Sequence, residues 1–225
     1  YKHNRPVPKV VSVEQTSNFG GGACWTLDEM KDVSAAAKRN NLAMHMDGAR
    51  LLNAVAATGT SAKDFAQQCD SAWIDLSKGL GCPVGAVLVG SKDFIDESWR
   101  WKHQFGGAMR QSGIIAAAGV YAFQNNVERM ADDHQNAKRL AQGLMQIPGI
   151  EVDPEEPETN MVFFDCAGLG MDNYDVSAKL LAKGVRIGAG YGPRDLMRAV
   201  THLDVDSAGI DRALEAVRDV AAGRD

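Results

Sequence analysis

Two short apolar segments, each followed at once by a polar motif, constrain the fold of this chain most strongly. The first, Leu42 to Met46, runs into Asp47-Gly48-Ala49-Arg50, and the second, Ala72 to Leu76, runs into Ser77-Lys78-Gly79. A helical stretch around residues 62–68 separates them. A strand, a helix and a strand in this order form a crossover between parallel strands, whose carboxyl ends meet at one edge of the sheet. The sequence therefore predicts an α/β fold with Asp47 and Lys78 at a shared edge.

Neighbouring segments extend this predicted sheet. Lys9 to Glu14 is a β-branched run that predicts a strand, and the glycine-rich stretch Asn18 to Gly22 predicts a flexible loop after it. Thr26 and Glu29 have capping-box spacing, so we expect a helix that reaches Arg39. Val84 to Val89 predicts a third buried strand, which we expect to be antiparallel because it follows the preceding strand almost directly.

The second half of the chain has a different pattern. Gln111 to Ile147 is rich in Ala, Leu, Glu, Gln and Lys and predicts one or two long helices. Beyond Gly149 we expect strands at Met161–Cys166, Val185–Ile187 and Met197–Thr201, and helices near 175–183 and from Asp206. We therefore expect a boundary near residue 125, with a large domain over residues 1–125 and a small α+β domain over residues 126–225.

Composition excludes several classes of function. The chain has 225 residues with 24 Lys plus Arg against 29 Asp plus Glu and no long basic run, which disfavours a nucleic-acid partner. Its longest apolar run, Ile114 to Phe123, is far shorter than the roughly 20 residues that span a bilayer, so we expect no membrane partner. The four cysteines lack CxxC or CxxH spacing, which argues against a zinc or disulfide framework and favours a reducing cytoplasm.

An amine and a carboxylate at one sheet edge are the smallest set of side chains with which a protein can bind and activate pyridoxal 5'-phosphate. The lysine forms an imine with this cofactor, and the aspartate keeps the pyridine nitrogen protonated. The alternative is a turn aspartate and a surface lysine, since both residue types are usually solvated. His45 and Asp47 have no evident third ligand, so we expect no metal site. Gly79-Leu80-Gly81 and Gly85 miss the GxGxxG spacing, which excludes a dinucleotide turn.

Three motifs carry a family resemblance: His45-Met46-Asp47-Gly48-Ala49-Arg50, the run from Leu76 to Gly85 (LSKGLGCPVG), and Gly106 to Gln111 (GGAMRQ). Together they closely resemble the low-specificity threonine aldolases, which are fold-type I enzymes that depend on pyridoxal 5'-phosphate. The resemblance extends over essentially the whole chain, from Val13 to Asp204. It implies the C-terminal part of a large cofactor-binding domain, followed by a small α+β domain.

The resemblance also implies roles for individual residues. Lys78 and Asp47 are the expected catalytic residues, one bound to the cofactor as an imine and the other paired with its ring nitrogen. Arg50 and Arg198 are the expected clamps on the substrate carboxylate. The cofactor would be held by Lys78, Asp47, Arg50, Ser77 and Arg110, the last as a phosphate ligand that reaches across from a neighbouring subunit.

The implied activity is cleavage of L-threonine, L-allo-threonine and related β-hydroxy-α-amino acids to glycine and an aldehyde. The enzyme would be a cytoplasmic homo-oligomer, a dimer or tetramer, that acts on a small amino acid. The alternatives are another fold-type I β-eliminating lyase, a hydroxymethyl transferase, or a catalytically inactive fragment. The resemblance begins in the middle of the cofactor domain, so we expect an upstream segment to supply a cofactor-stacking histidine and a phosphate loop. These 225 residues alone would then bind the cofactor poorly.

Overall fold

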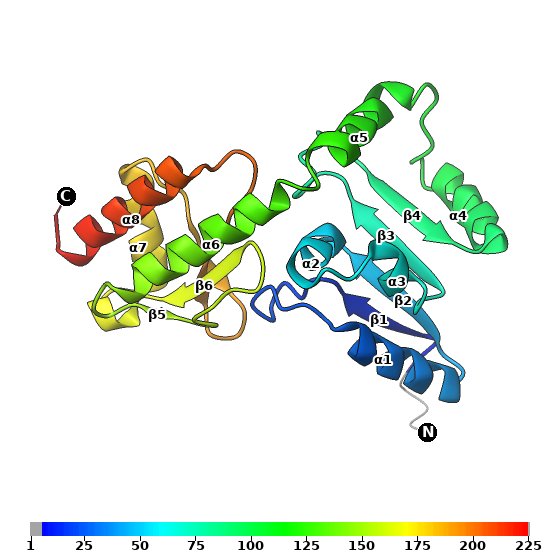
Figure 1. The fold of residues 1–225 in the computed structure, drawn as a ribbon, viewed down its shortest axis with the longest axis horizontal. Coiled ribbons are helices and arrows are strands. Elements are labelled where there is room, and N and C mark those ends of the chain that lie inside the picture. Colours follow the sequence, from blue (N-terminus) through cyan, green and yellow to red (C-terminus); the bar gives the residue numbers. More distant parts are fainter. Residues whose placement is uncertain (1–5, 225) are drawn as a thin grey trace. The chain divides into compact units, whose positions relative to one another are not determined.

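The computed structural model describes residues 6–224, which form two compact units (Figure 1). The first unit comprises residues 6–16 and 25–127, and the second comprises residues 17–24 and 128–224. Each unit has its own four-stranded sheet. The domain boundary expected near residue 125 remains a prediction.

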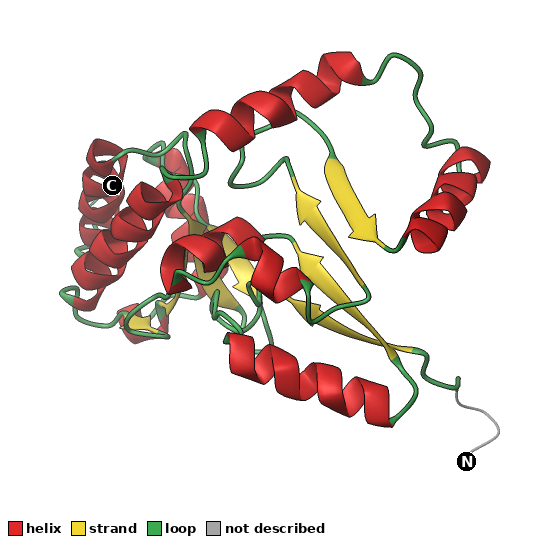
Figure 2. Cartoon of the chain, turned by 45° about the vertical axis from the view of Figure 1, so that its right-hand side comes forward, coloured by secondary structure: helices red, strands yellow, loops and turns green. Residues whose placement is uncertain are grey.

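The sheet of the first unit has the strand order β1-β2-β3-β4. These strands are β1 (Val10–Glu14), β2 (Ala43–Gly48), β3 (Ser71–Asp75) and β4 (Ala86–Gly90). The first three are parallel and β4 is antiparallel to β3, as Figure 2 shows. The predicted α/β class and the antiparallel direction of the fourth strand are both confirmed.

The helices of the first unit are α1 (Leu27–Arg39), α2 (Leu51–Thr58), α3 (Ala62–Ala66), α4 (Lys92–Gln104) and α5 (Gly113–Asn125). Helix α1 begins with the predicted capping box, in which the Glu29 N–H donates to Thr26 Oγ1 at 3.2 Å and the Thr26 N–H donates to Glu29 Oε2 at 2.8 Å. Helices α2 and α4 were not predicted. Their signals are Gly59, which ends α2 in the left-handed conformation, and Ser91, which caps α4.

The two faces of the first sheet differ in polarity. On β2, Met44 and Met46 are 2% and 0% exposed, whereas His45 and Asp47 alternate with them and are half-buried. Helix α1 packs next to β2 and buries Met30 completely. Because side chains alternate across a strand, burial of the methionines places the polar residues on the other face.

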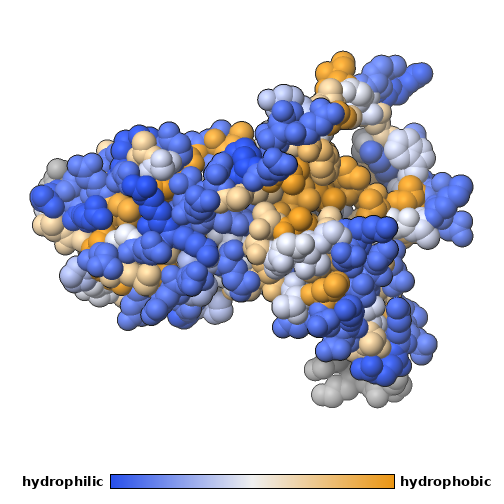
Figure 3. Space-filling model, viewed as in Figure 1, coloured by the Kyte–Doolittle hydropathy of each residue, from blue (hydrophilic) through white to orange (hydrophobic). Residues whose placement is uncertain are grey.

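Strand β4 is exposed along its whole length, so the prediction of a buried strand was wrong. Val87, Leu88 and Val89 are 40–41% exposed, because β4 is an edge strand that pairs with β3 alone among the described strands. Exposed apolar side chains also occur on α4 and α5, where Trp99 and Ile114 are 53% and 81% exposed. Figure 3 shows hydrophobic residues gathered around β3, β4 and α5. An apolar edge strand of this kind is prone to pair with other chains.

The sheet of the second unit is antiparallel and has the order β5-β6-β8-β7. Its strands are β5 (Glu151–Val152), β6 (Met161–Asp165), β7 (Gly188–Tyr191) and β8 (Leu196–Val200), and its helices are α6 (Met130–Met145), α7 (Asn173–Ala182), α8 (Ser207–Ala221) and the 3-10 turn Ala167–Leu169. The predicted long helical region is thus two helices, α5 and α6. The strand expected at Val185–Ile187 was wrong, because pairing with β8 begins at Gly188 while Ile187 is buried in the core.

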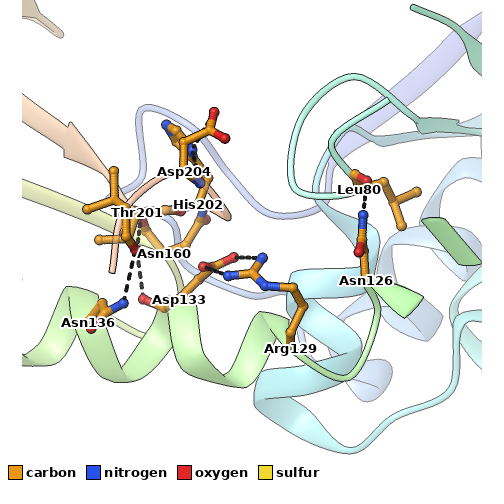
Figure 4. A network of polar contacts seen from close by, with 10 residues as sticks. Leu80, Asn126, Arg129, Asp133, Asn136, Asn160, Thr201, His202 and Asp204 are labelled. Carbon is orange, nitrogen blue, oxygen red and sulfur yellow. Dashed lines mark hydrogen bonds and ion pairs between the residues drawn. The ribbon is translucent and has the colours of Figure 1, made fainter. Parts of the chain in front are cut away.

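A buried polar network fixes the start of α6 to the sheet of the second unit (Figure 4). Asp133 is 0% exposed and accepts two hydrogen bonds from the Arg129 guanidinium, at 2.5 and 3.1 Å. The Thr201 hydroxyl donates to the Asp133 carbonyl at 2.6 Å, and the Asn160 side-chain amide donates to the Thr201 carbonyl at 2.8 Å. The buried charge is therefore paired, as low-dielectric surroundings require.

Residues 17–24 leave the first unit and pack on the second, and we call them the glycine loop. The Thr159 hydroxyl donates to the Gly22 carbonyl at 2.8 Å, and the Cys24 N–H donates to Glu158 Oε2 at 3.0 Å. Gly22 has φ +81°, and a Cβ there would lie 2.8 Å from Thr159 Oγ1. Glycine is required both for this backbone conformation and for the close approach.

We predict that Gly22→Ala destabilises the second unit more than Gly59→Ala destabilises the first. Both glycines have positive φ, but a Cβ at Gly59 would meet nothing within 4 Å. Gly59→Ala should therefore show only backbone strain, about 1–2 kcal/mol, whereas Gly22→Ala adds the cost of overpacking, about 1–3 kcal/mol. Urea unfolding followed by circular dichroism measures both. Equal losses would contradict the close packing of the loop.

Candidate active site

Asp47 lies near the carboxyl end of β2, between the strands β1 and β3. Its register partners are Glu14 on one side and Trp73 on the other. Asp47 Oδ1 accepts a hydrogen bond from the Ala49 N–H at 3.0 Å, and its carbonyl accepts one from the Gln15 N–H at 2.7 Å. These bonds fix a half-buried carboxylate at the edge of the sheet.

Lys78 follows β3 and lies at the same edge. Its Nζ is 3.2 Å from Asp75 Oδ2 and 5.6 Å from the centroid of the Trp73 ring. Trp73 is the register partner of Asp47, so Trp73 neighbours both the carboxylate and the amine. The Lys78 side chain is 38% exposed, which leaves the amine accessible to a ligand.

Asp75 and Trp73 were not singled out from the sequence, although Asp75 and Lys78 have the i, i+3 spacing of an ion pair. Asp75 Oδ1 accepts hydrogen bonds from the Ser77 N–H and hydroxyl, at 2.7 and 2.8 Å. Burial alone would raise the pKa of the Asp75 carboxyl, but the bonds from Ser77 and the ammonium of Lys78 outweigh it and lower this pKa. Asp75 is therefore an anion, and in this form it orients the ammonium of Lys78. The hydrogen bonds from Ser77 stabilise the Asp75 carboxylate.

The other predicted site residues have different surroundings. Arg50 is the residue before α2, half-buried, and its N–H donates to the Gln15 carbonyl at 3.0 Å, so its backbone lies at the same edge as Asp47. Arg110 is exposed in the turn between α4 and α5. Arg198 is on β8 and therefore belongs to the second unit. No contact in the described part of the chain joins Arg110 to Asp47 or Lys78.

Arg198 has an unusual hydrogen-bond pattern. Nη1 donates to Asn18 Oδ1 at 2.5 Å, and the guanidinium carbon lies 3.9 Å from the centroid of the Tyr191 ring. Nε is buried and has no hydrogen-bond partner among residues 6–224. An unmade bond to a buried donor costs about 1–3 kcal/mol. Such a donor is ready to bind an acceptor from outside the chain.

Other chemistries find less support in the described residues. The His45 ring nitrogen Nδ1 is 2.8 Å from Ser71 Oγ, and no group of three His, Cys, Asp or Glu side chains within residues 6–224 could hold a metal ion. Burial raises the pKa of Cys24 and Cys166 to about 12 and that of Cys69 to about 11, so these thiols are protonated and weakly nucleophilic. No helix in the same residues is long and apolar enough to cross a bilayer.

Comparison with known proteins gives a consistent result. Residues 2–167 match the beta-eliminating lyase family. A low-specificity L-threonine aldolase of Escherichia coli is 43% identical over 198 residues, which are 88% of this chain and 56% of the relative. The chain thus spans about half the length of this curated relative.

Solved structures share the fold. The chain resembles a threonine aldolase of Leishmania major with a TM-score of 0.78 and 20% identity, over 98% of this chain and 64% of the other. It also resembles an aspartate aminotransferase of Rhizobium meliloti, with a TM-score of 0.70, 18% identity, and coverage of 95% and 58%. These likenesses confirm the predicted fold-type I architecture.

We predict that Asp75→Asn lowers the stability of the first unit near neutral pH and that the difference from the parent disappears in acid. The folded pKa of Asp75 is below its ordinary value of 3.8. Its ionised form therefore stabilises the folded chain above that value, and this stabilisation is lost as the pH falls through the folded pKa. Urea midpoints across this pH range measure the effect, with the exposed Asp32→Asn on α1 as control. A difference that does not depend on pH would contradict the ionic role of Asp75.

Proposed function

The chain belongs to the beta-eliminating lyase family, and from this we propose that it forms part of a carbon-carbon lyase that uses pyridoxal 5'-phosphate. The substrates would be L-threonine, L-allo-threonine and related β-hydroxy-α-amino acids, and the products glycine and an aldehyde. The observation that carries the proposal is the shared edge at which Asp47 and Lys78 both neighbour Trp73. Relatives named low-specificity L-threonine aldolase support the choice of substrate.

The chemistry of the donor set fits the cofactor. An accessible primary amine and a fixed carboxylate lie at one sheet edge, and no group of three His, Cys, Asp or Glu side chains among residues 6–224 could hold a metal ion. The residues that would hold the cofactor are Lys78, Asp47, Arg50, Ser77 and Arg110. When bound, pyridoxal 5'-phosphate supplies an electron sink for the charge left on the substrate Cα after bond cleavage.

Each of these residues would then have a separate role in the reaction. The Asp47 carboxylate, which accepts a hydrogen bond from the Ala49 N–H, would pair with the ring nitrogen and keep it protonated. Asp75 keeps the Lys78 side chain directed along the face of Trp73. Arg198 and Arg50 bind the substrate carboxylate, and a two-bond clamp on that group fixes the orientation of the Cα–Cβ bond that breaks.

The setting of the enzyme is part of the same proposal. We expect a cytoplasmic homo-oligomer, a dimer or tetramer, in which Arg110 of one subunit reaches the cofactor phosphate of another. Exposed apolar side chains on β4, α4 and α5 support self-association.

We predict that Lys78 carries the cofactor. Borohydride reduction of the protein with pyridoxal 5'-phosphate, followed by peptide mapping, should place a pyridoxyl group on Lys78, since its amine stands beside Trp73 and Asp75. Lys78→Arg is the control that keeps the charge and should remove the label. A label on Lys38, Lys92 or Lys102 would show that the site is elsewhere. Aldehyde release from L-threonine by the full-length protein tests the reaction itself.

We predict that Arg198→Lys mainly weakens substrate binding and leaves the visible absorbance of the bound cofactor in place. An ammonium cannot reproduce the two parallel bonds of a guanidinium, and loss of one charge-assisted bond costs about 1.5–3 kcal/mol, or about ten- to a hundredfold in kcat/KM. Steady-state kinetics with L-threonine measure this change. Unchanged kinetics would remove Arg198 from the clamp.

A further inference from the structure

Lys78 lies on a loop whose backbone is fixed at several points. The Leu76 carbonyl accepts a hydrogen bond from the Cys82 N–H at 2.8 Å, which closes the base of the loop. Leu80 is 2% exposed, and its carbonyl accepts a bond from the Asn126 side-chain amide at 2.8 Å (Figure 4). The position of the loop is therefore set by buried contacts, and the remaining freedom belongs to the long Lys78 side chain.

The Lys78 amine has one anionic and one aromatic neighbour. Its Nζ is 3.2 Å from Asp75 Oδ2 and 5.6 Å from the centroid of the Trp73 ring. The Asp75 side chain is only 11% exposed, so this carboxylate is largely shielded from water. Within residues 6–224, the ion pair of Lys78 is with Asp75 and not with Asp47. The two carboxylates at this sheet edge therefore have different partners.

The orientation of Asp75 does not depend on the lysine alone. Asp75 Oδ1 accepts bonds from the Ser77 N–H and hydroxyl at 2.7 and 2.8 Å, which leaves Oδ2 to face the ammonium. The backbone of Asp75 is held in β3, where its register partner is Ala86 of β4. A preorganised acceptor loses little side-chain entropy when an ammonium binds to it. Asp75 can therefore receive the Lys78 ammonium whenever the lysine is not bonded to another group.

The proposed reaction releases such a lysine in each turnover. The substrate amine arrives as an ammonium at neutral pH and takes the place of Lys78 on the cofactor. A bond from the substrate nitrogen forms, the bond from Lys78 Nζ breaks and leaves its electron pair on Nζ, and one proton passes from the substrate nitrogen to Nζ. The released lysine is thus an ammonium, and a partly buried ammonium without a counter-ion would be costly.

We propose that Asp75 and Trp73 are positioning residues that receive the Lys78 ammonium when the substrate displaces this lysine from the cofactor. The inference rests on the proposed function and gives the two carboxylates separate roles. Asp47 pairs with the ring nitrogen, whereas Asp75 is the counter-ion for the proton that the substrate brings. The indole face of Trp73 adds a cation–π attraction and keeps the amine close, so that Lys78 can return when glycine leaves.

Borohydride trapping tests this role without a catalytic readout. When the full-length protein loaded with pyridoxal 5'-phosphate is reduced with increasing glycine present, the pyridoxyl group is found on Lys78 if the lysine is in place and on glycine if it is displaced. We expect the half-displacing glycine concentration to rise about three- to tenfold in Asp75→Asn, as for an ion pair partly screened by solvent. In Trp73→Leu we expect a rise of about two- to fivefold.

Methylamine separates an effect on the lysine from an effect on substrate binding. It also arrives as an ammonium but has no carboxylate, so Asp75→Asn should raise its half-displacing concentration by the same factor as that of glycine. Asp75→Glu keeps the charge and should stay within about threefold of the parent. The matched control is Asp28→Asn, which removes an exposed ion pair of the same i, i+3 spacing to Lys31 and should behave as the parent.

A second measurement uses the protein without cofactor. Acetic anhydride reacts with a free amine and not with an ammonium, so the ion pair with Asp75 should slow acetylation of Lys78. Peptide mapping gives the rate at Lys78 relative to Lys38, which is exposed on α1. Asp75→Asn should raise this relative rate about three- to tenfold, whereas Asp28→Asn should leave it unchanged.

The outcomes distinguish the inference from the proposed function. Parent-like displacement by both amines in Asp75→Asn, or an unchanged acetylation rate at Lys78, would overturn the role of Asp75, even if Trp73→Leu does not fold. A rise with glycine but not with methylamine would also overturn it. A rise with both amines, in a parent that releases no aldehyde from L-threonine, would uphold the positioning role and refute the proposed reaction. Absence of the pyridoxyl group from Lys78 in the parent would refute both.

Discussion

The register of three parallel strands is the constraint on which the candidate site depends. Glu14, Asp47 and Trp73 are successive register partners across β1, β2 and β3. A slip of one residue on β2 would move Met44 and Met46, which are 2% and 0% exposed, to the polar face and bury His45 and Asp47 instead. Burial of each methionine contributes about 1.5–3 kcal/mol. Apolar packing on the hidden face therefore fixes the position of the polar groups on the other.

Local signals made part of this arrangement predictable. The crossover and the polar motifs at the strand ends were enough to predict that Asp47 and Lys78 lie at one edge, and the Thr26 capping box located α1. Trp73 and Asp75 were missed, because the role of a residue inside a strand depends on which neighbour it faces. That information comes from the register and not from the composition of the strand.

The sequence was less informative where burial or long-range contact decides the outcome. A covered strand and an exposed edge strand can both have an apolar run such as Val84 to Val89. The exposure of β4 therefore could not be predicted from this pattern. Strand β7 is rich in glycine, so its sequence gives no strand signal, and the strand forms because it pairs with β8. The bond between Asn18 and Arg198 joins residues 180 positions apart, and no periodic pattern encodes such a contact.

Two arginines of the second unit show why Arg198 is better explained by ligand binding than by packing. Arg129 forms two bonds to the buried Asp133, so its charge is paired within the chain. Arg198 is also partly buried, yet its acceptor is neutral and its Nε is orphaned within residues 6–224. A site that required only packing would be filled at least as well by an apolar side chain, because replacing a desolvated charge by a hydrophobic residue is often neutral or stabilising. The second unit thus contains one arginine whose charge is paired with a carboxylate of the chain and one whose charge and buried Nε a substrate carboxylate would pair with.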